Sequence, residues 1–167
     1  MLGSSREPAH RVECIISGGQ TGADRAALDA ALSLGLEVAG WVPAGRWAED
    51  GPIPMRYPSL YETVSADPAE RTRLNVRDSD ATLICSHGAL VGGSLLTLKY
   101  ACTLSRPVLH LDFSQLSKAE AVQQGRAWLH NVQPKRLNVA GPRASEAPRI
   151  YDAVFGLLSR LLVSDAA

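Results

Sequence analysis

The sequence predicts an α/β domain with an open, doubly wound parallel sheet and helices on both of its faces. Short apolar runs alternate with segments of helical periodicity along most of the chain. Apolar strands of this kind are typical of a parallel sheet that is buried on both sides, and right-handed crossovers place the helices over its two faces. Glycines stand between several runs and the helices that follow them, as at Gly18-Gly19 and Gly141.

The first half of the chain is expected to hold three strands and two helices. The strands are predicted at residues 12–17, 36–42 and 61–64. The first helix places Leu28, Ala31 and Leu32 on one face and stops at Gly35. The second is predicted over residues 67–78, because Asp67 can cap it and Pro-Ala-Glu suits its first turn.

The second half continues the alternation. Strands are predicted at 81–86, 107–111 and 136–140, and helices at 92–105 and 117–132. A final helix carries one apolar stripe, made of Ile150, Val154, Leu157, Leu158, Leu161 and Leu162.

Length and composition indicate one domain over residues 12–163, after a polar lead-in at 1–11 that we expect to be disordered or loosely attached. The chain has 167 residues, 46% of them hydrophobic, which is enough for a core without disulfides. Lys+Arg and Asp+Glu both count 17, so no excess charge argues for nucleic acid or an anionic membrane as partner.

The cysteines and the absence of targeting patterns favour the cytoplasm. Cys14, Cys85 and Cys102 show no CxxC spacing, and we interpret all three as buried thiols in a reducing compartment. The lead-in lacks the apolar segment of a signal peptide, and no apolar run approaches the roughly 18 residues of a membrane span.

The first glycine-rich turn is a candidate anion site. Glycines let the backbone approach a ligand, and free N–H groups at the start of a helix attract negative charge. Asp24 follows in the first helical turn, where it either stabilises the helix start or binds a ribose or base edge. The candidate ligand-binding residues of this turn are Ser17, Gly18, Gly19, Gln20, Thr21 and Gly22.

Two further turns have the same character. After the fourth predicted strand, the candidates are Gly88, Gly92, Gly93, Ser94 and Thr97, with His87 as a weak catalytic candidate. After the last strand, Asn138 and Arg143 flank a turn where an arginine could complete a phosphate clamp. Ligands of open α/β sheets lie beyond the carboxyl ends of the strands, so we expect the three turns to share one pocket.

The loop over residues 43–59 is long for a compact domain, and such loops often cover a site. Arg46 is a candidate ligand contact, and Glu49 and Asp50 are candidates for an acid/base pair or magnesium ligands. The alternative is an internal Arg46 salt bridge that fixes the loop. No spacing of His, Cys or carboxylates suggests a structural metal.

Four segments closely resemble the family of molybdenum carrier proteins, which includes the algal molybdenum-cofactor carrier. They are ISGGQTGADRAALD at 16–29, GWVPAGRWAEDGPIP at 40–54, NVRDSD at 75–80 and LNVAGPR at 137–143. The resemblance spans about residues 12–162. It implies a Rossmann-like fold, an assembly of identical subunits, and molybdenum cofactor or a nucleotide as the ligand.

The same superfamily holds the lysine decarboxylase-like phosphoribohydrolases, which cleave nucleoside monophosphates. Arg71 stands eight residues before Ser79-Asp80, as the arginine does in those enzymes. Their catalytic glutamate has no counterpart here, because Lys99 or Tyr100 stands near its expected position. Without that carboxylate the usual activation of water is missing.

Three hypotheses about function remain at this point. The leading hypothesis is a protein that binds and carries a phosphate-bearing small molecule. The alternatives are a nucleotide hydrolase, with Arg71, Glu49 or Asp50 in the active role, and a nucleotide-sensing module.

Overall fold

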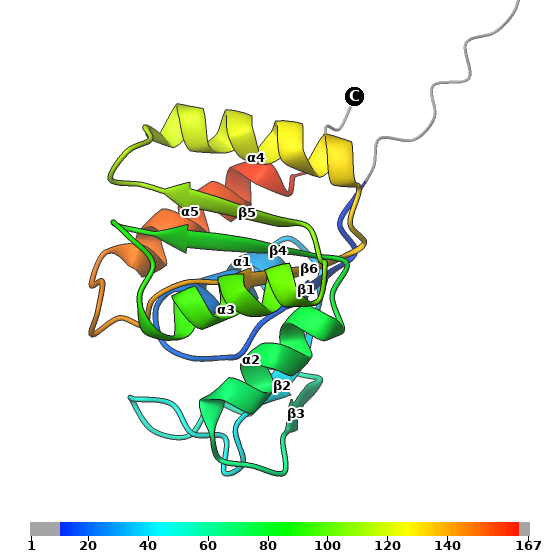
Figure 1. Cartoon of the computed structure of the whole chain (residues 1–167), viewed down its shortest axis with the longest axis vertical. Helices are drawn as coiled ribbons and strands as arrows, with labels where there is room; N and C mark the ends of the chain where they lie inside the picture. Colours follow the sequence, from blue (N-terminus) through cyan, green and yellow to red (C-terminus); the bar gives the residue numbers. More distant parts are fainter. Residues whose placement is uncertain (1–10, 164–167) are drawn as a thin grey trace, which may run out of the picture.

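The computed structural model describes residues 11–163, which form one sheet of parallel strands flanked by helices (Figure 1). All but the last residue of the predicted lead-in lies outside the described residues. The strands are β1 (Cys14–Ile16), β2 (Glu37–Val42), β3 (Leu60–Glu62), β4 (Ala81–Ser86), β5 (Val108–Asp112) and β6 (Arg136–Ala140). The helices are α1 (Ala23–Ser33), α2 (Pro68–Arg77), α3 (Gly92–Thr103), α4 (Lys118–Val132) and α5 (Ile150–Leu161).

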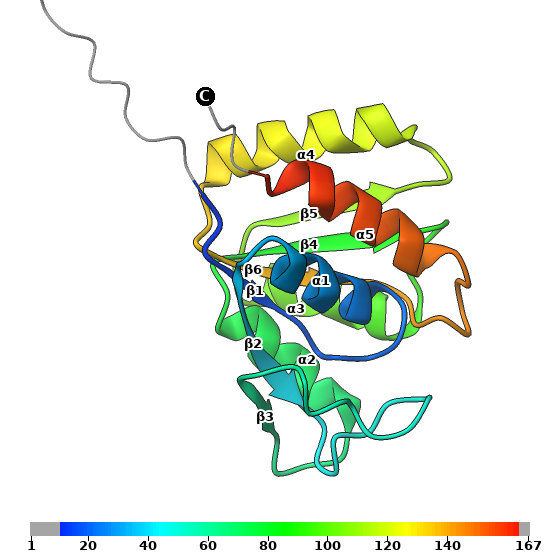
Figure 2. The ribbon, with the colours of Figure 1, turned by 180° about the vertical axis from the view of Figure 1, so that it is seen from behind.

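The sheet has the order β3-β2-β1-β6-β4-β5, and every neighbouring pair is parallel. Helix α5 packs against α1 and α4 on one face, and α2 packs against α3 on the other (Figures 1 and 2). The predicted doubly wound α/β fold is therefore confirmed.

The connections explain where a ligand crevice can form. The crossover connections through α1 and α4 lie on one face of the sheet and lead toward the β3 edge. Those through α2 and α3 lie on the other face and lead toward the β5 edge. All four crossovers therefore have the same handedness. The neighbouring strands β4 and β6 then lead into helices on opposite faces, α3 and α5. Such a point of divergence opens a crevice at the carboxyl ends of the strands.

The core lies on both sides of the central strands. Ile15, Leu83 and Leu137 are completely buried, and all six residues of the apolar stripe predicted for α5 are buried. Cys14 and Cys85 are buried as expected, but Cys102 is exposed, so that prediction was wrong for the third cysteine. Helix α3 turns Ser94, Thr97 and Ala101 inward, which leaves Cys102 on its outer side. Over residues 11–163, no helix is long and apolar enough to cross a membrane.

Candidate functional site

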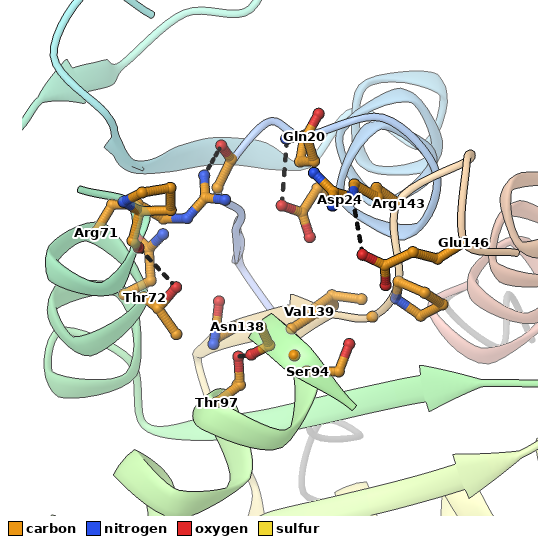
Figure 3. Close-up of a pocket in the computed structure, with 18 of the residues that line it drawn as sticks. Gln20, Asp24, Arg71, Thr72, Ser94, Thr97, Asn138, Val139, Arg143 and Glu146 are labelled. Atoms are coloured by element: carbon orange, nitrogen blue, oxygen red, sulfur yellow. Dashed lines mark hydrogen bonds and ion pairs between the residues drawn. The ribbon is translucent and has the colours of Figure 1, made fainter. Parts of the chain in front are cut away.

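A cavity of about 250 Å³ lies between the segments that follow β1, β4 and β6, with α2 along one side (Figure 3). The three turns predicted to share a pocket are brought together here. Their lining residues are Gly18, Gln20 and Asp24 from the first turn, Gly92, Gly93, Ser94 and Thr97 from the second, and residues 138–143 with Glu146 from the third. Helix α2 adds Pro68, Arg71, Thr72 and Asn75, and the long loop adds Trp47.

The β1–α1 turn uses most of its own hydrogen-bonding groups. The Ser17 hydroxyl donates to the Asp24 carbonyl (3.0 Å) and accepts the Gly19 N–H (3.2 Å). The Gln20 N–H donates to the Asp24 carboxylate (3.2 Å), and the Thr21 N–H donates to the Gln20 side chain (3.0 Å). Of the predicted ligand residues at 17–22, only Gly18 and Gln20 line the cavity. Most of this turn is therefore engaged in hydrogen bonds within the protein, and Gly18 and Gln20 are its predicted residues that face the cavity.

The β6–α5 turn closes the N-terminus of α1. The Ala23 N–H donates to the Pro142 carbonyl (3.2 Å), and the Ala144 N–H donates to the Thr21 hydroxyl (3.0 Å). Gly22 has a φ of 76°, and a Cβ there would lie 2.6 Å from the Pro142 carbonyl oxygen. Thr21 and Gly22 thus join two turns, and the start of α1 is already occupied by the protein itself.

The N-terminus of α3, by contrast, is open to the cavity. Its N-cap, Val91, provides no side-chain cap. The N–H groups of Gly92, Gly93 and Ser94 have no acceptor within residues 11–163, and the Ser94 hydroxyl has no partner there either. Ser94 is only 6% exposed, and it lines the cavity (Figure 3). Free amides, a helix dipole and an unpaired hydroxyl that is still accessible to solvent together form a site for an anion.

Two arginines reach the cavity from different elements. Arg71 of α2 is half-buried and donates to the Gly18 carbonyl (2.7 Å). Burial lowers the pKa of its guanidinium, and the nearby Asp24 opposes that shift; an arginine stays charged under either influence. Arg143 lies at the rim, where its Nε donates to Glu146 (2.8 Å). The cavity therefore has a positive side at α2 and a second cation at its edge.

Asp24 is the buried acidic group of this cavity, whereas Glu146 lies exposed at the rim and is paired with Arg143. Its residue is 8% exposed, and its Oδ2 accepts the Gln20 N–H. A Cβ on Gly18 would lie 2.7 Å from Arg71 Nη1 and 3.0 Å from Asp24 Oδ2, so both side chains lie close to the Cα of Gly18 and leave no room for a larger residue there. Burial raises the pKa of Asp24 to about 6, although the charge of Arg71 and the Gln20 N–H act in the opposite direction.

We expect Asp24→Asn to stabilise the fold at neutral pH. Because the folded pKa of about 6 lies above the ordinary value of 3.8, the native state holds its proton more tightly and loses stability as pH rises through this interval. An asparagine avoids the buried charge and should gain up to about 3 kcal/mol near pH 7.5. Urea unfolding should show that gain shrinking toward about pH 4. An equal gain at both pH values would mean that ionisation of Asp24 is not the cause.

The candidates in the long loop do not line the cavity. Arg46 donates to the carbonyls of Ile53 (3.0 Å), Pro54 (3.1 Å) and Leu60 (3.4 Å). Arg46, predicted as a ligand contact, therefore holds the loop from within and does not line this cavity. The alternative was correct that the loop is fixed from within, but Arg46 achieves this through carbonyls and not through a salt bridge.

Glu49 and Asp50 also hold the loop in place. The hydroxyls of Ser145 and Thr21 donate to Glu49, which keeps its pKa below the usual range. Asp50 pairs with both terminal nitrogens of Arg25 at 2.9 Å. The expected acid/base pair or magnesium site is thus not assembled in the cavity. Within residues 11–163, no group of three or more His, Cys, Asp or Glu is placed to hold a metal ion.

The remaining candidates divide between the cavity and its surroundings. Asn138 lines the cavity and donates to the Thr82 hydroxyl (3.3 Å), and the Thr97 hydroxyl donates to the Gly93 carbonyl (2.9 Å). Gly88 does not line the cavity, and its N–H donates to the Asp112 carboxylate (2.8 Å). His87 instead faces Phe113 in a separate, mainly apolar hollow between α4 and α5.

Asn75 and Trp47 also line the cavity, although neither was predicted as a site residue. The Asn75 amide pairs with the backbone N–H and carbonyl of Trp41 (2.7 and 3.0 Å), which fixes α2 beside β2. Trp47 is 49% exposed at the mouth of the cavity. An asparagine within an amphipathic helix and a tryptophan in a long loop were the available signals, but neither points to a particular pocket.

Comparison with known proteins supports this architecture. No protein with a curated description matches the sequence. The crystal structure of a "Putative molybdenum carrier protein" from Syntrophus aciditrophicus SB superimposes with a TM-score of 0.90 and shares 46% sequence identity. The match covers 96% of this chain and all of that one. The model of the circularly permutated YpsA SLOG family matches residues 15–162. The chain therefore belongs to the circularly permutated YpsA family of SLOG proteins.

Proposed function

We propose that this protein binds and carries a small molecule that bears a phosphate group. The observation behind the proposal is the open N-terminus of α3, where the N–H groups of residues 92–94 and the Ser94 hydroxyl lack protein partners within residues 11–163. Arg71 provides a positive charge in the same cavity. These groups suit the terminal oxygens of a phosphate, and Arg143 can approach it from the rim.

Two ligands agree with this chemistry. The name of the relative from Syntrophus aciditrophicus favours molybdenum cofactor, whose pterin carries a phosphate. A nucleoside monophosphate carries the same kind of phosphate group, attached to a nucleoside and not to a pterin. Both would place the anion at α3 and extend toward Asp24 and Asn138 across the cavity.

Ser94→Ala should weaken binding of inorganic phosphate and of guanosine monophosphate by about 10- to 100-fold, because a hydrogen bond to a charged group contributes about 1.5–3 kcal/mol. Isothermal titration calorimetry measures both affinities. Thr103→Ala is the matched control, since Thr103 is exposed at the opposite end of α3 and lies outside the cavity lining. Failure of the wild-type protein to bind either ligand at millimolar concentration would contradict the proposal.

Nucleotide hydrolysis is the second candidate, favoured by the position of Arg71 in the cavity beside a buried acid. The purified protein can be incubated with nucleoside monophosphates and assayed for free base. Release that disappears in Arg71→Ala would replace the carrier function with an enzymatic one. Binding without release supports the carrier.

A further inference from the structure

The cavity contains a buried hydrogen-bond acceptor among groups that mainly donate. The α3 amides, the Ser94 hydroxyl and Arg71 all suit an anion. Asp24 does not, because a second negative charge close to a phosphate is repelled. A buried carboxylate is also costly, as its raised pKa indicates. We therefore expect the ligand to carry a hydrogen-bond donor that pairs with the Asp24 carboxylate.

One of the two carboxylate oxygens of Asp24 is available. Oδ2 accepts the Gln20 N–H, whereas no donor within residues 11–163 reaches Oδ1. Oδ1 still contacts solvent, because no side-chain oxygen or nitrogen among the described residues is both fully buried and without a partner. Figure 3 shows the Asp24 and Ser94 side chains entering the cavity from opposite sides. A ligand that fills the cavity can therefore bind α3 through one end and Asp24 through the other.

We propose that Asp24 selects ligands that carry a neutral hydrogen-bond donor, a hydroxyl or an amino group, in addition to their phosphate. This inference rests on the proposed function and specifies the other end of the same ligand. A sugar hydroxyl and the amino group of a heterocycle are the two sources of such a donor. Both would satisfy the free oxygen, and a simple phosphate would not.

A role for Asp24 in the helix start alone does not account for these observations. The N-terminus of α1 is already closed by the Pro142 carbonyl and the Thr21–Ala144 contact. A solvent-exposed acid in the first turn would provide the same favourable interaction with the helix dipole without the cost of burial. Stabilisation of the start of α1 therefore does not explain why the Asp24 side chain is buried and directed toward the cavity.

Asp24→Asn is a sharp test because it keeps the shape of the side chain while it removes the negative charge and turns one hydrogen-bond acceptor into a donor. The Gln20 N–H requires an acceptor, so the asparagine oxygen is expected at the Oδ2 position and its NH₂ toward the cavity. The variant thus presents a donor where the wild type presents an acceptor. Asp152→Asn, on the exposed first turn of α5, is the matched control.

Calorimetry with methyl phosphate and guanosine monophosphate distinguishes the affinity contributed by the phosphate from that contributed by the rest of the ligand. Wild-type protein should bind guanosine monophosphate more tightly than methyl phosphate. The Asp24→Asn variant should bind methyl phosphate equally or more tightly, and guanosine monophosphate about 10- to 100-fold more weakly, the effect of one lost charged hydrogen bond. Inosine monophosphate removes the amino group and the 2′-deoxy analogue removes a hydroxyl, so the analogue that abolishes the effect of Asp24→Asn identifies the donor.

Each failure has its own signature. If the wild type binds neither phosphate ligand, the proposed function is wrong and this inference is wrong with it. If methyl phosphate binds normally but Asp24→Asn leaves the affinity for guanosine monophosphate unchanged or higher, only the inference is overturned. An equal loss for both ligands also overturns it, since Asp24 would then support the phosphate site and not the donor.

Discussion

Gly93→Asp should abolish phosphate binding and leave the fold intact. A Cβ at Gly93 meets no atom within 4 Å, and its φ lies outside the left-handed region, so the side chain fits without strain. An acidic residue in the first turn of a helix is favourable for the helix itself. The new carboxylate would occupy the free α3 amides and repel an incoming anion, lowering the affinity by at least about 100-fold. Calorimetry with inorganic phosphate measures the loss.

Gly93→Asn separates charge from size in this experiment. Asparagine has nearly the shape of aspartate but no charge, so it should retain measurable affinity, weakened only by partial blocking of the amides. Thermal unfolding of both variants should stay close to the wild type, because the position is exposed. Normal phosphate binding by the aspartate variant would show that the anion site is not at α3.

The fold was largely predictable because each element has a local signal. Apolar runs marked the strands, and Asp67-Pro68 started α2, where the Asp67 side chain accepts the Ala69 N–H (3.0 Å). The strand order was not predictable from such signals. The strand at 136–140 lies between β1 and β4, which are remote from it in sequence, and this placement depends on which strand edges pair.

The candidate site was predictable in outline for the same reason. Glycines at strand ends indicated which turns would meet, because carboxyl ends of parallel strands share one edge. The sequence could not show which turn would keep free amides. In the first turn, Ser17, Gln20 and Asp24 hydrogen-bond the backbone, and Pro142, which is distant in the sequence, closes the helix. After the second turn, the N–H groups of residues 92–94 have no such partner among residues 11–163, so the start of α3 stays open.

The junction between the first and third turns should be highly sensitive to a single added methyl group. Gly22→Ala places a Cβ 2.6 Å from the Pro142 carbonyl oxygen and 2.9 Å from the Ala144 nitrogen. Both atoms belong to the backbone and cannot rotate away. We expect a loss of about 3 kcal/mol in the free energy of unfolding, from the overlap together with the left-handed backbone. Urea denaturation measures it.

Gly35→Ala separates the two causes of the loss expected for Gly22→Ala, which are the steric overlap and the left-handed backbone. Gly35 has a φ of 72°, close to the 76° of Gly22, yet a Cβ added at Gly35 would meet no atom within 4 Å. This variant should therefore lose only the cost of a left-handed alanine, about 1 kcal/mol. The difference between the two variants measures how tightly the β6–α5 turn is packed on the start of α1. Equal losses would mean that the two turns can separate, and the cavity between them would then lack the rigid wall that positions Asp24.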